Sequence, residues 1–371
     1  MLTLLNRIEC YAPEYIGTND ILIANEKIEK IMPPDSQNWP KEVNTIPCDG
    51  LLAFPGLIDQ HVHIIGGGGE QGVSSRIAEI NSSEIFMAGI TTLVGVLGLD
   101  RYTKSLESLL AKTKALESEG LTALMYTGSY SVPAVTLTGS IARDLVLIDA
   151  IIGVGEIAIS DQRSSQPEFR DLAQLASQAF TGGMVGGKAG IVHIHVGDGK
   201  SGLGPLTELL SRSDFSRDQF IPTHVNRNHP LFCQAVQYCR NGGQIDLTAG
   251  ETAGISVSDA VCRLLAELGS LSGVTVSSDA NGSIPGGGVG KIGILFEDLR
   301  ECIVGRGLSP ETILPLVTRN VAKVLKLYPR KGVIREGSDA DILITSRDFR
   351  VRKLFCKGIL KVDQGRPFTD G

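Results

Sequence analysis

The stretch Phe54-Pro55-Gly56-Leu57-Ile58-Asp59-Gln60-His61-Val62-His63 decides how the rest of this chain is interpreted. Its apolar residues are typical of a buried β strand, and two histidines stand two positions apart at its end. Because residues i and i+2 of a strand face the same side, both imidazoles can converge on one metal ion. An isolated His-x-His pair is weak evidence, since it arises by chance, so other parts of the chain must supply the remaining ligands.

Beyond this strand, the central part of the chain alternates apolar β runs with helical patterns. Strands are expected at residues 91–97, 122–128, 150–159, 191–196, 220–224, 244–248 and 274–278. Helices are expected at residues 102–119 and 167–180, and after several of the later strands. Such alternation indicates a parallel sheet with crossover helices, and about eight β units suit a barrel better than an open sheet. The sequence therefore predicts an α/β fold built on a (β/α)8 TIM barrel.

The two ends of the chain instead show short β segments separated by turns. Strands are expected at residues 4–10, 21–24, 27–32, 341–345, 351–356 and 357–362, with a turn at residues 17–20. The chain has 371 residues, which exceeds the roughly 250–300 residues at which a single hydrophobic core usually stops growing. We therefore expect two domains: a small β-sandwich built from residues 1–53 and 330–371, and the TIM barrel over residues 54–329.

Composition and charge limit the kind of partner. The formal net charge is −6, and the chain has no run of lysine and arginine. These features argue against nucleic acid and against an anionic membrane surface, and favour a small-molecule substrate. No signal peptide is expected because Arg7 and Glu9 interrupt the apolar start, and no apolar window is long enough for a membrane span. Seven scattered cysteines without a CxxC pair predict reduced, buried thiols in a cytoplasmic protein.

Further metal-ligating side chains stand at the ends of other expected strands. His195 and His224 each end an apolar run, and Asp279 follows the last one. Because catalytic residues of TIM barrels lie at the carboxyl ends of the strands, these side chains are expected to meet His61 and His63. Imidazole and carboxylate ligands suit Zn²⁺ or a similar first-row ion. The sequence therefore predicts a metal site at this end of the barrel.

A structural role competes with each of these assignments. A single histidine is more often a hydrogen-bonded structural residue than a ligand, and only the combination favours a metal. His193 shares a strand face with His195 but lies deeper in the barrel, so we expect it to be structural. His229 is expected to begin the helix that follows the His224 strand.

Several motifs give the chain a family resemblance that runs nearly from end to end. The motif around His61 and the tail at residues 337–341 resemble the amidohydrolase superfamily. Between them, the chain is similar to the isoaspartyl (β-aspartyl) dipeptidase family at residues 66–70, 127–133, 158–163, 195–198, 222–227 and 277–283. The resemblance implies metal-dependent hydrolysis of the isopeptide bond of β-aspartyl dipeptides by a metal-bridging hydroxide. It also implies a homo-oligomer.

The resemblance implies a centre of two divalent metal ions, with Zn²⁺ as the expected ion. His61 and His63 would hold one ion together with Asp279, while His195 and His224 would hold the other. A hydroxide would bridge the ions, since metal binding lowers the pKa of water. Asp279 would also take the proton of this nucleophile and pass it to the leaving amine.

Glu156 departs from the family pattern. The family has a lysine at this place, carboxylated so that its carbamate bridges both metals, whereas other branches of the superfamily use a glutamate. Glu156 supplies the negative charge without modification, but its side chain is shorter than the carbamate. We expect Glu156 to bridge the two metals. The alternative is that it lies outside the ligand shell and that only one metal binds tightly.

The resemblance also implies residues that bind the ammonium and the two carboxylates of the substrate. Glu70 is the expected partner of the ammonium, and Arg163 and Arg227 are those of the carboxylates, because a guanidinium can donate two parallel hydrogen bonds. Tyr130 would polarise the scissile carbonyl, and Ser283 would bind a substrate carboxylate. For each residue the alternative is a charged or aromatic side chain of the barrel rim without a role in binding.

Other activities keep the same metal ligands. A cyclic amidase or an N-acyl amino acid deacylase of the same fold is the nearest alternative, although the set of Arg163, Arg227, Glu70 and Tyr130 favours the dipeptidase. A metal-free scaffold protein would be expected to have lost histidines that are present here. Leu99 stands where the family has a threonine that assists substrate binding, which indicates a broader or shifted substrate preference.

Overall fold

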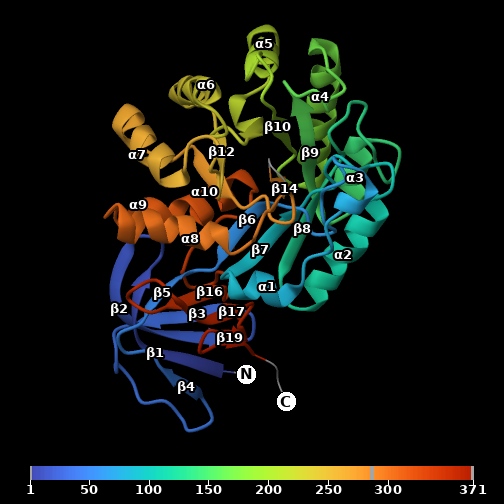
Figure 1. Ribbon diagram of the computed structural model, residues 1–371. Coiled ribbons are helices and arrows are strands. Elements are labelled where there is room, and N and C mark those ends of the chain that lie inside the picture. Colours follow the sequence, from blue (N-terminus) through green and yellow to red (C-terminus); the bar gives the residue numbers. More distant parts are fainter. Residues whose placement is uncertain (1, 285–287, 369–371) are drawn as a thin grey trace.

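Parallel strands form the inner layer of the larger region of the molecule (Figure 1). A computed structural model describes residues 2–284 and 288–368. The strands are β6 (Leu57–Val62), β7 (Ile90–Gly95), β8 (Thr122–Thr127), β9 (Ile151–Ile159), β10 (Ile191–Val196), β11 (Phe220–Thr223), β12 (Ile245–Thr248) and β13 (Val274–Ser277). Six of them pair in the order β11-β10-β9-β8-β7-β6, and β12 pairs with β13. Each strand expected in the central part of the chain is present, with small shifts at its ends.

Helices cover the outside of these strands, which makes this region a TIM-barrel-like α/β domain (Figure 1). They are α1 (Ser82–Met87), α2 (Leu106–Ser118), α3 (Ile141–Leu147), α4 (Phe169–Gly186), α5 (Gly204–Arg212), α6 (His229–Arg240), α7 (Val257–Leu268), α8 (Ile294–Arg300), α9 (Pro310–Ile313) and α10 (Arg319–Val324). Short helical turns are η1 (Val73–Ser75), η2 (Arg217–Gln219), η3 (Glu301–Gly305) and η4 (Leu314–Val317). The expectation that His229 begins a helix is confirmed.

Helix ends follow local capping chemistry. The helix expected at residues 102–119 begins later, because the Ser105 side chain accepts a hydrogen bond from the Ser108 backbone N–H and caps α2. In the same way the Asn228 side chain caps α6. Helix α4 runs further than the expected residue 180 and ends where Gly187 adopts a left-handed conformation, with φ of 65°.

The two ends of the chain share one sheet (Figure 1). Its strands are β1 (Leu2–Tyr11), β2 (Tyr15–Ala24), β3 (Lys27–Met32), β4 (Asn44–Pro47), β5 (Leu52–Pro55), β16 (Ile342–Thr345), β17 (Val351–Cys356), β18 (Ile359–Asp363) and β19 (Arg366–Pro367). They pair in the order β19-β18-β17-β16-β5-β1-β2-β3, with β4 on β1. Strands β5 and β16 are antiparallel and join the two termini, and β5 leads through Gly56 into β6. A separate hairpin pairs β14 (Ser283–Ile284) with β15 (Gly288–Val289).

The turn expected at residues 17–20 is wrong. Strand β2 runs through these residues, and the chain turns at residues 12–14, where the Ala12 N–H donates to the Glu14 carbonyl. Gly17 has φ of 85° and pairs with Cys10 beside a register shift. Long-range pairing with β1 therefore outweighs the local turn preference of the glycine and asparagine in this segment.

The cysteines match the sequence expectation only in part. All seven are free, and Cys10, Cys48, Cys302 and Cys356 are buried. Cys233, however, is exposed, so the expectation that the thiols are all buried is wrong. Cys233 lies on the outer face of α6, whereas Leu231 and Phe232 of the same helix are buried. Among the described residues, no helix combines the length and the apolar character needed to cross a membrane.

Candidate active site

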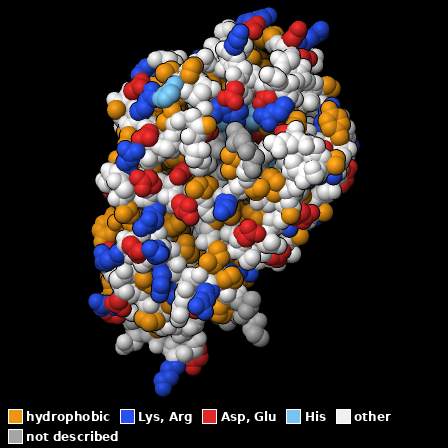
Figure 2. Space-filling view, in the orientation of Figure 1, with side chains coloured by type: hydrophobic (Ala, Val, Ile, Leu, Met, Phe, Trp, Pro, Cys, Tyr) orange, Lys and Arg blue, Asp and Glu red, His pale blue; other side chains and the backbone are white. Residues whose placement is uncertain are grey.

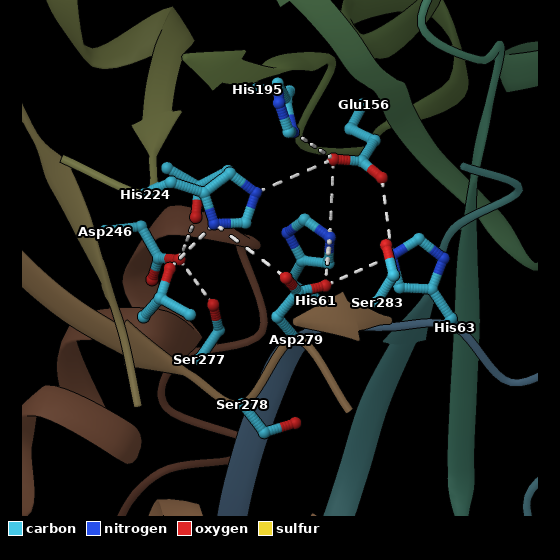
Figure 3. Close-up of polar contacts among 12 residues, drawn as sticks. His61, His63, Glu156, His195, His224, Asp246, Ser277, Ser278, Asp279 and Ser283 are labelled. Atoms are coloured by element: carbon cyan, nitrogen blue, oxygen red, sulfur yellow. Dashed lines mark hydrogen bonds and ion pairs between the residues drawn. The ribbon is translucent and has the colours of Figure 1, made fainter. Parts of the chain in front are cut away.

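Six of the predicted site residues converge at the carboxyl ends of the strands (Figure 3). His61 lies in β6 and His63 directly follows it, His195 lies in β10, and His224 directly follows β11. Their rings surround the carboxylates of Glu156 in β9 and Asp279 just beyond β13. The Nε2 atoms of His61 and His63 lie 3.4 and 3.1 Å from Oδ1 of Asp279. The predicted metal ligands are therefore neighbours in space.

Glu156 lies between the histidines. Its Oε2 is 3.1 Å from Nδ1 of His195, 3.5 Å from Nε2 of His61 and 3.8 Å from Nε2 of His224. Its Oε1 is 3.5 Å from Nε2 of His63. The side chain is fully buried. Glu156 is therefore not an exposed residue, and its carboxylate faces the histidines of the cluster.

A β-bulge brings Glu156 to this position. Val154 pairs with Val192 and Ile157 pairs with Ile194, so Gly155 and Glu156 together oppose the single residue His193 on β10. A Cβ on Gly155 would lie only 2.7 Å from the Cβ of His193, so only glycine allows this close approach. Bulges re-aim side chains next to active sites. Here the bulge directs the short Glu156 side chain into the cluster.

The cluster carries an electrostatic field that favours a cation. Burial alone would raise the pKa of Glu156, but the charge of His61 and the contacts with the His195 and His224 rings hold it well below its usual range. Burial opposes ionisation of Asp279 as well, and His61 and His63 still keep its pKa low. Burial lowers the pKa of His61, yet Glu156 and Asp279 raise it to about 9. Two ionised carboxylates therefore stand in a buried pocket and attract positive charge.

Unpaired polar atoms in the cluster fit a metal. Within the described residues, His61 Nε2, Glu156 Oε1 and Asp279 Oδ1 are buried and have no hydrogen-bond partner. Leaving such a group unsatisfied costs about 1–3 kcal/mol, more for a charged one. Ligand atoms of His61, His63 and Asp279 lie within 4.8 Å of one another, as do those of His61, Glu156 and His224. A divalent cation would satisfy each group.

The predicted substrate-binding residues line a cavity of about 370 Å³ above the cluster. They are Glu70, Tyr130, Arg163, Arg227 and Ser283, and Leu99 lies in the same wall. Ser283 donates a hydrogen bond of 2.8 Å to Oε1 of Glu70, and Nη1 of Arg163 lies 3.7 Å from the same oxygen. Acidic and basic side chains gather on this face of the molecule, around the place of β14 (Figure 2).

Tyr130 lies beside a histidine of the cluster. Its hydroxyl is 3.0 Å from Nδ1 of His195. Burial, followed by the charge of Glu156, raises the pKa of Tyr130 well above its usual value. The phenol therefore stays protonated and can donate a hydrogen bond to a developing oxyanion.

A second cavity of about 430 Å³ adjoins the first. The two share Arg227, Asp279 and Ser283. The second cavity extends past His224 toward the loop after β12 and the start of α8, with apolar walls from Ala249, Val289 and Ile294. Space for a second part of a ligand therefore lies beside Arg227, in a cavity that extends beyond the one lined by Glu70.

Sequence reasoning gave His193 a structural role without identifying its partner, and it missed two other residues that orient the histidines. Nε2 of His193 lies 2.9 Å from Nδ1 of His61, so this buried residue supports a site histidine directly. Thr248 Oγ1 lies 2.7 Å from Nδ1 of His224. Asp161 Oδ2 lies 3.0 Å from Nε2 of His195. The one available signal was position, since Asp161 stands in the same motif as Arg163 and Thr248 ends β12.

Known proteins match the chain at two levels. A family model described as "Amidohydrolase family" matches residues 236–360. N-acetylglucosamine-6-phosphate deacetylase of Bacillus subtilis strain 168 is 23% identical over 373 residues, which cover 93% of this chain and 91% of that protein. The structure of D-hydantoinase from a Thermus species has a TM-score of 0.71 at 16% identity and covers 99% of this chain and 97% of that one. At such identities the likeness concerns the fold alone.

One solved protein is much more similar. The β-aspartyl dipeptidase of Fervidobacterium islandicum AW-1, in complex with a β-Asp-Leu dipeptide, is 41% identical to this chain with a TM-score of 0.94. The match covers 100% of this chain and 99% of the other. A second crystal structure of the dipeptidase from this organism matches at 40% identity with the same TM-score.

Proposed function

The chain belongs to the β-aspartyl dipeptidase family of the metal-dependent amidohydrolases, and we propose that it hydrolyses the isopeptide bond of β-aspartyl dipeptides. One observation supports this function most strongly. The cavity above the metal-ligating cluster places the carboxylate of Glu70 beside two guanidinium groups, Arg163 and Arg227. A β-aspartyl dipeptide carries one ammonium, which suits Glu70, and two carboxylates, which suit the two arginines.

Two divalent ions are part of this proposal. His61 and His63 would hold one ion with Asp279, His195 and His224 would hold the other, and Glu156 would supply a carboxylate shared by both. Zn²⁺ is the proposed ion, because imidazole and carboxylate donors suit it. When bound, the ions activate water at neutral pH and polarise the scissile carbonyl.

The remaining chemistry falls to residues of the chain. Asp279 is ionised at neutral pH, so it can take the proton of the attacking water and deliver it to the leaving amine. Tyr130 donates its phenolic proton in a hydrogen bond to the carbonyl oxygen as negative charge develops there.

The spacing of the charged groups orients the substrate. The ammonium and α-carboxylate of the aspartyl residue share one carbon, and Glu70 and Arg163 lie 3.7 Å apart. This pair therefore binds the aspartyl head group with the help of Ser283. Arg227 binds the C-terminal carboxylate, and the second cavity accepts the side chain of the leaving residue against its apolar walls.

The domain organisation is proposed on similar grounds. The His63 N–H donates to the Ala280 carbonyl at 2.9 Å, and Val62 bridges to Ala280, which supports closure of the strands between β13 and β6 into an eight-stranded barrel. We propose this barrel as one domain over residues 54–329. The shared terminal sheet supports a second domain, a small β-sandwich of residues 1–53 and 330–371.

A cytoplasmic homo-oligomer completes the proposal. Seven free cysteines support a reducing compartment. Helices α3 and α4 pack closely, since a Cβ on Gly182 would lie 2.7 Å from Ala142. Both helices expose apolar side chains, namely Val146, Leu147, Phe180, Met184 and Val185. Exposed apolar side chains on two packed helices support an interface between copies of the chain.

Hydrolysis of paired isomers tests the function. We expect β-Asp-Leu to be cleaved with kcat/KM roughly 100-fold or more above that of α-Asp-Leu, because the α isomer lacks the free α-carboxylate that Arg163 binds. The measurement is the rate of leucine release, detected by chromatography. A cyclic amide and an N-acetyl amino acid are the controls. Preferential cleavage of either control would favour the cyclic amidase or the deacylase instead.

Arg227→Ala is expected to lower kcat/KM for β-Asp-Leu by roughly ten- to a hundredfold while metal content stays intact. The reason is the loss of a charge-assisted hydrogen bond to a carboxylate, worth about 1.5–3 kcal/mol. Arg227→Lys keeps the charge but loses the planar fork, so an intermediate value is expected. Arg366→Ala, at an exposed position in β19, is the matched control. If Arg227→Ala and this control have the same kcat/KM for β-Asp-Leu, Arg227 does not bind the substrate.

A further inference from the structure

Asp161 contacts both halves of the site. It lies just beyond the end of β9, and its side chain is almost fully buried. Its Oδ1 accepts hydrogen bonds from Nε and the backbone N–H of Arg163, at 2.9 and 2.8 Å. Its Oδ2 accepts one from Nη2 of Arg163 at 2.7 Å and lies 3.0 Å from Nε2 of His195. One carboxylate therefore holds a substrate-binding arginine and a metal-ligating histidine.

The contact with Asp161 orients the His195 ring. A neutral imidazole carries its proton on one nitrogen and a lone pair on the other. The carboxylate beside Nε2 keeps the proton there, because only a protonated Nε2 can donate to Asp161. Nδ1, which lies 3.1 Å from Oε2 of Glu156, then presents its lone pair to the metal-ligating cluster. A carboxylate behind a ligating histidine is a recurring device that strengthens metal binding.

The same carboxylate orients the Arg163 guanidinium. Asp161 engages its Nε and Nη2 edge, and the guanidinium carbon lies 5.4 Å from the centre of the Tyr130 ring. Nη1 is left on the side of Glu70, where the substrate head group binds. Gly197, which directly follows β10, leaves room for the Asp161 side chain. A Cβ at this position would lie 2.5 Å from the Cβ of Asp161.

We propose that Asp161 is a positioning residue that fixes His195 for the metal and Arg163 for the substrate carboxylate at the same time. Substrate recognition and metal retention then depend on a single side chain that contacts neither the substrate nor the metal. The Arg163 half of the inference rests on the proposed function, whereas the His195 half needs only that the cluster binds metal. The two halves can therefore be tested separately.

Asp161→Asn tests the inference in the metal-loaded enzyme. The amide is similar in size but has no charge, and it cannot accept from Arg163 and His195 with both of its polar atoms. We expect metal retention against a chelator to weaken roughly 10- to 100-fold, with one equivalent lost before the other. We also expect KM for β-Asp-Leu to rise roughly tenfold or more. Metal equivalents by mass spectrometry and steady-state kinetics are the two readouts, and thermal unfolding checks the fold.

Two further variants keep the test decisive. Asp161→Glu restores the carboxylate, so it should regain part of the metal retention. Asp198→Asn removes a carboxylate from the wall of the same cavity, where Asp198 bonds to Asn228 at 3.2 Å, and should retain metal like the wild type. Wild-type metal retention in Asp161→Asn would overturn the His195 half, and so would equal metal loss in Asp198→Asn. An unchanged KM would overturn the Arg163 half. A wild-type enzyme that binds metal but leaves β-aspartyl dipeptides intact would instead refute the proposed function.

Discussion

His61→Ala is expected to remove bound metal and turnover together. His61 belongs to both groups of metal-ligating atoms, and its Nε2 lies 3.4 Å from Asp279 and 3.5 Å from Glu156. Loss of this ring therefore removes a ligand of one proposed ion and also a close neighbour of Glu156, the proposed bridge to the other ion. We expect kcat/KM to fall on the order of 10⁴-fold or more, as for other groups that act as part of one catalytic unit. Metal analysis of the purified variant and hydrolysis of β-Asp-Leu are the measurements.

His229→Ala is the matched control for this substitution. His229 begins α6, lies near Arg263 at the surface and contributes no atom to the metal-ligating groups. Its removal should leave metal content and rate unchanged. Because His61 is fully buried, thermal unfolding must show that the variant is still folded. Full turnover by metal-stripped wild-type enzyme would contradict the metal-dependent reaction itself.

Glu156→Gln is expected to produce the second-largest loss, roughly 100-fold or more in kcat/KM. Two divalent ions a few ångströms apart repel one another and need a shared anion between them. Glu156 faces the four histidines of the cluster (Figure 3). The glutamine amide that replaces it is neutral, and its NH₂ group cannot coordinate a metal there. We expect one metal equivalent to be lost much more readily than the other, measured by titration of the metal-free variant with Zn²⁺.

A test of bicarbonate dependence distinguishes the carboxylate of a glutamate from the carbamate that forms on a lysine. Because Glu156 carries its charge without modification, reconstitution of the metal-free wild type should be indifferent to bicarbonate. Glu156→Lys should be inactive without bicarbonate, and added bicarbonate should restore activity if the pocket has room for the longer carbamate. Bicarbonate-dependent wild-type activity would refute Glu156 as the bridge. So would a metal-bound crystal structure in which another anion bridges the ions.

Local patterns were sufficient to predict much of the fold. The strands at residues 27–32, 191–196 and 351–356 have the expected bounds, because a short apolar or alternating run flanked by turn residues depends on few distant contacts. The spacing of His61 and His63 indicated a shared strand face for the same reason. Parallel strands place their carboxyl ends at one edge, so the meeting of His195, His224 and Asp279 with this pair also followed from the order of the elements.

The sequence by itself indicated the histidines and carboxylates of the candidate site, whereas the tertiary structure decided how each one points and which residues orient it. The bulge that aims Glu156 is a matter of pairing register between β9 and β10. The contacts of His193 with His61 and of Asp161 with His195 join atoms from different strands. The wrong prediction of a turn at residues 17–20 has the same cause, since pairing with β1 overrode a local preference. Register and hydrogen-bond partners depend on residues far apart in the chain, so a local sequence pattern does not predict them.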